Sequence, residues 1–175
     1  KPLDELAPQR PDTSIISAKM FFNIIGQFGV HLFCMAKIVA MAKELEPVEE
    51  FDPDAEDASE FKPTLVNSAV FLIAISMQAS TIFTNYHGKP FMGGLDDNKG
   101  LVRCLLVLWG ITILATLQFS TGFNEFLELV PFSSEFGNAM GMIIVADAAG
   151  AYAVDFITHI LFPLETSLAM KALRA

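Results

Sequence analysis

Four long apolar runs dominate the sequence and limit the folds that it can adopt. They cover residues 20–42, 63–84, 101–119 and 136–162. An α-helix rises about 1.5 Å per residue, so about 20 apolar residues cross a hydrocarbon core about 30 Å thick. The runs therefore predict an all-α membrane protein in which four transmembrane helices pack as a bundle.

The composition agrees with a membrane location and excludes several other classes of protein. Hydrophobic residues make up 53% of the chain and charged residues 18%, whereas soluble domains are about 25% charged. The formal net charge of −9 argues against a nucleic-acid partner, because phosphate contacts need clustered Lys and Arg. Cys34 and Cys104 lie in separate apolar runs, which suggests neither a disulfide framework nor a thiolate metal site.

The distribution of Lys and Arg predicts the orientation of the helices. Short loops rich in Lys and Arg stay on the cytosolic side. The basic residues concentrate in and beside the segments that we therefore expect to be cytosolic, which are 1–19, 85–100 and 163–175. The acidic loop 43–62 and the loop 120–135 are expected on the opposite side. Both ends are then cytosolic, and since the chain opens at Lys1 without a signal-peptide pattern, we expect it to be a piece of a longer polypeptide.

The fourth run carries three ionisable residues that share one helical face. Asp155 lies eight residues after Asp147, and His159 lies four residues after Asp155. Because an acid at the centre of a membrane helix costs about 2.5–3.5 kcal/mol, this face is expected to lie inside the bundle. Two interpretations stay open: an ion, proton or polar-substrate pathway, and structural pairing such as that of Asp155 with His159.

Small residues repeat at four-residue spacing in the same run, which predicts close packing of its backbone against a neighbouring helix. The pairs are Gly137 and Gly141, Ala146 and Gly150, and Ala149 and Ala153.

The first run has a polar stripe of its own. Asn23, Gln27 and His31 recur every four residues and so share one face. Amide side chains commonly form hydrogen bonds between membrane helices, and a hydrated cavity wall is the alternative. No spacing within either helix resembles a zinc motif, although His31, His159 and an acid are suitable ligand types. With no phosphate-binding loop and no nucleophile–base pair, the sequence predicts no catalytic residue and no metal site in this segment.

Several motifs resemble one known family. Residues 61–71 read FKPTLVNSAVF, residues 77–81 read MQAST, and residues 85–92 read NYHGKPFM. These resemble the last membrane domain of the type V, subfamily A P-type ATPases, where the text reads like F-x-P-S-L-V-N-S, M-Q-x-x-T and N-Y-x-G-x-P-F. Residues 22–31 are similar to the family's G-Q-F-x-V-H segment. The third motif forms a turn that contains Asn85, Tyr86, Gly88, Pro90 and Phe91.

The resemblance implies a function that the residues alone do not. It places the chain as the seventh to tenth membrane helices of an enzyme of the endoplasmic reticulum membrane, which uses ATP and Mg²⁺ and extracts transmembrane helices. The phosphorylated D-K-T-G-T motif is absent from this sequence. The four helices would support substrate-handling helices, with Asn23, Gln27, Asp147 and Asp155 facing that side. The implied partners are the lipid bilayer, the other helices and cytosolic domains of the parent ATPase, and a transmembrane-helix substrate.

Two other functions stay open. One is a P-type ATPase that transports a cation such as manganese and uses Asp147 and Asp155, which ion-stimulated ATP turnover would test. The other is a stand-alone four-helix membrane scaffold with no link to ATP. A D-K-T-G-T motif encoded upstream of Lys1 decides for the ATPase, and an initiating Met close by decides for the scaffold. The turn at 85–91 either braces the phosphorylation domain or simply ends a helix.

Overall fold

A computed structural model describes residues 17–46 and 63–163. It contains four long helices, α1 (Ala18–Leu45), α2 (Leu65–Asn85), α3 (Lys99–Thr116) and α5 (Ser134–Leu161). Each is long and apolar enough to cross a membrane, which confirms the predicted all-α fold of four transmembrane helices. Most of the expected N-terminal segment, acidic loop and C-terminal tail, together with the start of the 61–71 motif, lies outside the described residues.

Each long helix begins at a side chain that caps its free backbone N–H groups. The hydroxyl or amide oxygen of the capping residue accepts a hydrogen bond from the N–H three positions on, which satisfies a donor that the helix itself leaves free. The four caps are Ser17, Thr64, Asn98 and Ser133. Between α3 and α5 the chain adds a short helix, α4 (Thr121–Phe126), and before α3 a 3₁₀ turn, η1 (Leu95–Asp97).

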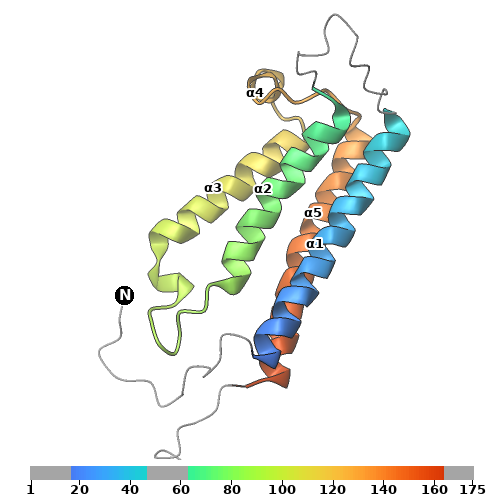
Figure 1. The fold of residues 1–175 in the computed structure, drawn as a ribbon. Helices are drawn as coiled ribbons and strands as arrows, with labels where there is room; N and C mark the ends of the chain where they lie inside the picture. The colour runs from blue at the N-terminus through green and yellow to red at the C-terminus, as the bar shows by residue number, and fades with distance from the viewer. Residues whose placement is uncertain (1–16, 47–62, 164–175) are drawn as a thin grey trace, which may run out of the picture.

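Three of the helices form the centre of the bundle. Helix α5 packs against both α1 and α2, while α3 packs mainly on α2 and touches α5 less (Figure 1). The buried core contains Ile38, Leu72, Ile73 and Met140. Large apolar side chains such as Phe33, which is 72% exposed, point outward, as expected where the surroundings are lipid.

Two glycines allow α1 and α5 to approach closely. A Cβ atom at Gly26 would lie 2.6 Å from Cγ1 of Val154, and one at Gly150 would lie 2.8 Å from Cγ1 of Val30. In each helix, the glycine contacts a valine of the other helix. The glycine and the valine of the same helix are four residues apart. This reciprocal contact fixes the antiparallel register of the pair, because any larger residue at either glycine would push the helices apart.

Candidate functional site

His31 and Asp147 form a polar contact between α1 and α5. Nδ1 of His31 lies 2.8 Å from Oδ1 of Asp147, and Nε2 of His31 lies 3.2 Å from the hydroxyl of Thr81. Asp147 is completely buried, and its other oxygen, Oδ2, has no hydrogen-bond partner among the described residues. A buried carboxylate needs a hydrogen-bond partner at membrane depth, and His31 supplies one from the neighbouring helix.

A cluster of amide side chains lies one to two helical turns from His31, toward the N-terminal end of α1. Nδ2 of Asn23 donates to Oδ1 of Asp155 at 3.0 Å, and Nε2 of Gln27 donates to Oδ1 of Asn23 at 2.8 Å. Gln27 and Asn85 exchange two hydrogen bonds, of 3.1 and 2.9 Å, between their side-chain amides. Nδ2 of Asn85 also donates to the backbone carbonyl of Thr81 at 3.0 Å. The cluster therefore joins α1, α2 and α5.

Two histidines complete the cluster around Asp155. Nε2 of His87 lies 3.2 Å from Oδ1 of Asp155, and Nδ1 of His159 lies 3.5 Å from the same oxygen. The two imidazole rings are 4.5 Å apart between centroids. His87 comes from the turn after α2, so this contact ties that turn to the last part of α5.

The contacts form one continuous polar seam between the three central helices. We use this name for nine residues: Asn23, Gln27, His31, Thr81, Asn85, His87, Asp147, Asp155 and His159. The register of α1 against α5 follows from the sequence spacing, because the numbers of two residues that face each other on antiparallel helices have a constant sum. Asn23 and His31 are eight residues apart, as are their partners Asp155 and Asp147. Hydrogen bonds of this kind are worth about 0.6 kcal/mol on average in membrane proteins.

The structure brings together all six intramembrane residues that the sequence singled out, which are Asn23, Gln27, His31, Asp147, Asp155 and His159. Their role in function stays a prediction. Sequence reasoning missed Thr81 and His87 as members of the seam and assigned Asn85 only to a turn. The four-residue spacing of Thr81 and Asn85 was the available signal for an inward face on α2.

The other turn residues lie apart from the seam. The carbonyl of Gly88 accepts hydrogen bonds from the backbone N–H groups of Phe91 and Met92, which closes a tight turn. A Cβ atom at Gly88 would overlap the backbone of Gly93, so this position requires glycine. Among the described residues, no side-chain hydrogen bond joins Tyr86 or Phe91 to the polar seam, and Pro90 has no side-chain donor or acceptor.

One face of α2 presents three polar side chains that stay exposed in the described part of the chain. Gln78, Thr81 and Asn85 follow at intervals of three and four residues, which places them on one face, and all three are exposed. Thr81 and Asn85 already form hydrogen bonds within the polar seam, whereas Gln78 has none among the described residues. An exposed amide without a partner is unfavourable against lipid, where no water replaces the missing hydrogen bonds. This exposed stripe is therefore a surface that needs protein or water beside it.

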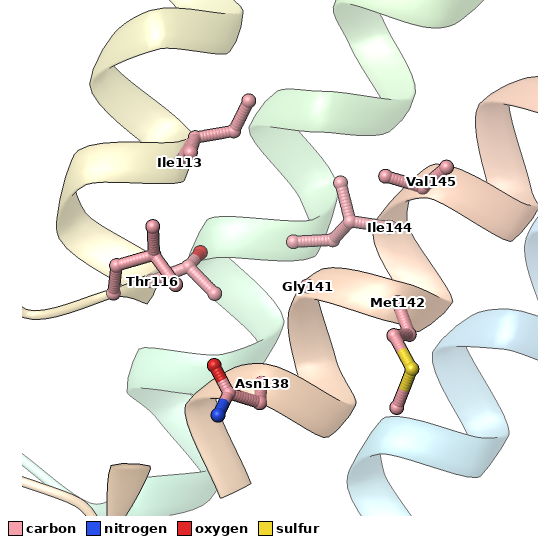
Figure 2. A pocket seen from close by; sticks show the side chains of 8 residues that line it. Ile113, Thr116, Asn138, Gly141, Met142, Ile144 and Val145 are labelled. Atoms are coloured by element: carbon pink, nitrogen blue, oxygen red, sulfur yellow. The ribbon is translucent and has the colours of Figure 1, made fainter. Parts of the chain in front are cut away.

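An apolar cavity of about 410 Å³ separates α3 from α5 at the end near α4. Figure 2 shows Ile113 and Thr116 of α3 across from Gly141 and Ile144 of α5. Asn138 adds the one amide of its lining. The cavity has the chemistry of a space for an acyl chain or an apolar side chain, and it holds no group that acts in catalysis.

Comparison with known proteins finds similar sequences along most of the chain. The chain is 31% identical over 162 residues, 93% of its length, to the endoplasmic reticulum transmembrane helix translocase of Saccharomyces cerevisiae. It is 29% identical over the same share to the protein of that name in Aspergillus fumigatus, and 33% identical over 75% of its length to a probable manganese-transporting ATPase of Arabidopsis thaliana. The chain spans only 11–13% of the length of these relatives. No model of a known protein family matches the sequence.

Proposed function

We propose that the chain is a membrane segment of a type V, subfamily A P-type ATPase and that it serves as the supporting helices of such an ATP-driven enzyme in the endoplasmic reticulum. The whole enzyme would move or extract transmembrane helices. The observation that carries this proposal is the similarity along 93% of the chain to two proteins named as transmembrane helix translocases.

The packing of α1 against α5 supports a static role for this segment. The reciprocal contacts of Gly26 with Val154 and of Gly150 with Val30 hold the two helices in one register. The polar seam adds hydrogen bonds at two depths of the same interface, at His31 and at Asn23. Sliding either helix would break both sets of contacts together, so these helices are suited to form a support against which others move.

The exposed stripe of Gln78, Thr81 and Asn85 supports a place within a larger membrane domain. Because Gln78 is exposed without a hydrogen-bond partner among the described residues, and its amide is unfavourable against lipid, this stripe fits a surface that meets the remaining helices of the parent ATPase or a hydrated path between them. ATP and Mg²⁺ would act elsewhere in the parent protein, since this sequence has no phosphate-binding loop and no D-K-T-G-T motif.

The proposed orientation places both ends of the segment in the cytosol. Helix α1 begins, α2 ends, α3 begins and α5 ends at the same end of the bundle (Figure 1). Lys89 and Lys99 also lie at that end, and positive charge favours the cytosolic side. Accessibility of a cysteine at Lys89 to a membrane-impermeant reagent from the cytosol would test this orientation, and labelling only from the lumen would contradict it.

Site-specific crosslinking tests the proposed function in the full-length protein. A photoreactive amino acid replaces Gln78 in the exposed stripe, or Phe33, which faces outward on α1, as a matched control. With a trapped transmembrane-helix substrate and ATP hydrolysis blocked, we expect crosslinks to the parent's own helices or the substrate from position 78 and to lipid alone from position 33. Crosslinks to lipid alone from both positions, or the absence of ATP turnover driven by transmembrane helices, would contradict the proposal.

Cation transport is a second candidate function with a specific basis. One relative is named as a probable manganese-transporting ATPase, and Asp147 and Asp155 are buried acids at membrane depth. ATP turnover of the purified full-length protein that rises with Mn²⁺ and is lost in Asp147→Asn would favour it. Turnover that responds to transmembrane helices and is indifferent to Mn²⁺ would favour the helix translocase.

A further inference from the structure

Three metal-ligand atoms converge at the end of the bundle where α2 and α5 finish. One possible ligand atom from each of His87, Asp155 and His159 lies within 4.8 Å of the other two. Oδ1 of Asp155 is 3.2 Å from Nε2 of His87 and 3.5 Å from Nδ1 of His159. A tetrahedral zinc ion with bonds of about 2.0–2.1 Å holds its ligands about 3.3–3.4 Å apart. Two edges of the triangle therefore already have the length that such an ion requires.

Three nitrogen atoms from three different elements surround one oxygen of the Asp155 carboxylate. Nδ2 of Asn23 already donates to it at 3.0 Å, so three nitrogens surround one oxygen. Nδ1 of His159 also lies 3.1 Å from the backbone carbonyl of Asp155, and it would give up this hydrogen bond, with its ring proton on Nε2 instead, to bind an ion. An ion between the two imidazoles and the carboxylate would use all three groups as ligands, with Asn23 left as the donor to Asp155.

A second layer of hydrogen bonds holds the carboxylate in place. Asn23, which donates to Asp155, accepts in turn from Gln27, and Gln27 is held by Asn85. Metal sites characteristically orient their ligands through such outer partners. The arrangement is therefore preorganised from the side of α1 and α2 before any ion binds.

The site is open to ions on one side. Asp155 is largely buried, at 10% side-chain exposure, whereas the side chains of His87 and His159 are 44% and 37% exposed. Two imidazoles and one carboxylate suit zinc and similar transition metals, whereas calcium and magnesium prefer oxygen ligands throughout. Three protein ligands leave a fourth tetrahedral position for water.

We propose that His87, Asp155 and His159 bind one divalent transition-metal ion of the zinc class, which fastens the turn after α2 to the end of α5. The sequence alone predicted no metal site, because His87 belongs to a different element from the other two ligands. This proposal rests on side-chain geometry and is independent of the proposed ATPase role.

Zinc binding to the full-length protein tests the proposal directly. The protein is stripped with a chelator, dialysed and titrated with ZnCl₂ in competition with a chromophoric chelator. We expect the wild type to bind one equivalent more than His87→Ala or His159→Ala, or to bind it at least about tenfold more tightly. Asn23→Ala, which removes only an outer partner, should weaken binding by about 10- to 100-fold. Co²⁺ in place of zinc should give the visible absorption of a tetrahedral site.

The matched control is His31→Ala, which removes a histidine that is also bonded to an aspartate but lies outside the cluster of His87, Asp155 and His159. It should leave the zinc affinity unchanged. Each variant is first compared with the wild type by size-exclusion chromatography, and Asp155→Asn keeps the shape of the ligand if an alanine variant misfolds. The proposal is overturned if His87→Ala and His159→Ala bind zinc with the stoichiometry and affinity of the wild type, or if His31→Ala lowers the affinity as much as they do.

Discussion

His31 and Asp147 meet at 2.8 Å across the interface of α1 and α5, and the same register places Asn23 against Asp155 eight residues away along both helices. One turn of either helix out of register would separate both pairs. The polar residues of the two helices therefore specify a single alignment, which apolar packing alone would specify less sharply. Buried polar groups have this role in other helical assemblies.

A double-mutant cycle measures the coupling between these two residues. His31→Ala and Asp147→Ala should each lower the thermal midpoint of the full-length protein in detergent, because each leaves a buried polar group without its partner. The double variant should lose less than the sum of the single losses, by about 1 kcal/mol, within the range of hydrogen bonds in membrane proteins. Additive losses would mean that the contact contributes nothing to stability.

Gly137 and Gly141 should respond oppositely to alanine, although the sequence pattern treats them alike. A Cβ atom at Gly137 would lie 2.6 Å from the carbonyl oxygen of Thr116, whereas one at Gly141 would lie 3.8 Å from the nearest atom. Gly137→Ala should cost about 1–3 kcal/mol through overpacking. Gly141→Ala should be neutral or stabilise by up to about 1 kcal/mol, because alanine favours the helix. Thermal midpoints in detergent compare the two, and equal losses would contradict the assigned packing.

The spans were predictable from the sequence because hydrophobic length is a local property. The helix bounds follow the apolar runs, and capping residues such as Ser17 and Ser133 lie within a few residues of the predicted starts. The short helix α4 was not predicted, because its six residues lie in a loop where local signals are weak.

The inward faces of α1 and α5 were also predictable, from polar residues at four- and eight-residue spacing. Which residues pair across helices was not, because pairing depends on the register and on the crossing of separate elements. His87 shows the limit: it lies in a turn, and only the fold brings it beside Asp155. The structure likewise separates Gly137 from Gly141, since packing density is a tertiary property.

The exposed stripe on α2 predicts a stability effect that depends on what covers it. Gln78→Leu should destabilise the full-length protein if a neighbouring helix or water satisfies the amide, because the partner then loses its hydrogen bond. Ile82→Leu, at an exposed apolar position of the same helix, is the matched control and should have little effect. Thermal midpoints in detergent and in lipid nanodiscs measure both. A stabilising effect of Gln78→Leu would show that this face meets lipid.

A disulfide between α1 and α5 tests whether the two helices stay fixed during turnover. An ideal Cβ atom at Gly150 lies 3.8 Å from Cβ of Val30, which is the mean separation of about 3.8 Å in disulfides. Val30→Cys with Gly150→Cys, in a Cys34→Ala background that removes the nearby free thiol, should therefore oxidise readily.

If the two helices act as a static support, the oxidised double variant should hydrolyse ATP as fast as the same protein after reduction. Substrate helices should also stimulate it equally in both states. The single variant Val30→Cys, treated with the same oxidant, controls for effects of oxidation elsewhere in the parent protein. Loss of turnover on oxidation that returns on reduction would show that α1 and α5 move relative to each other in the cycle, and the supporting role proposed for them would then be wrong.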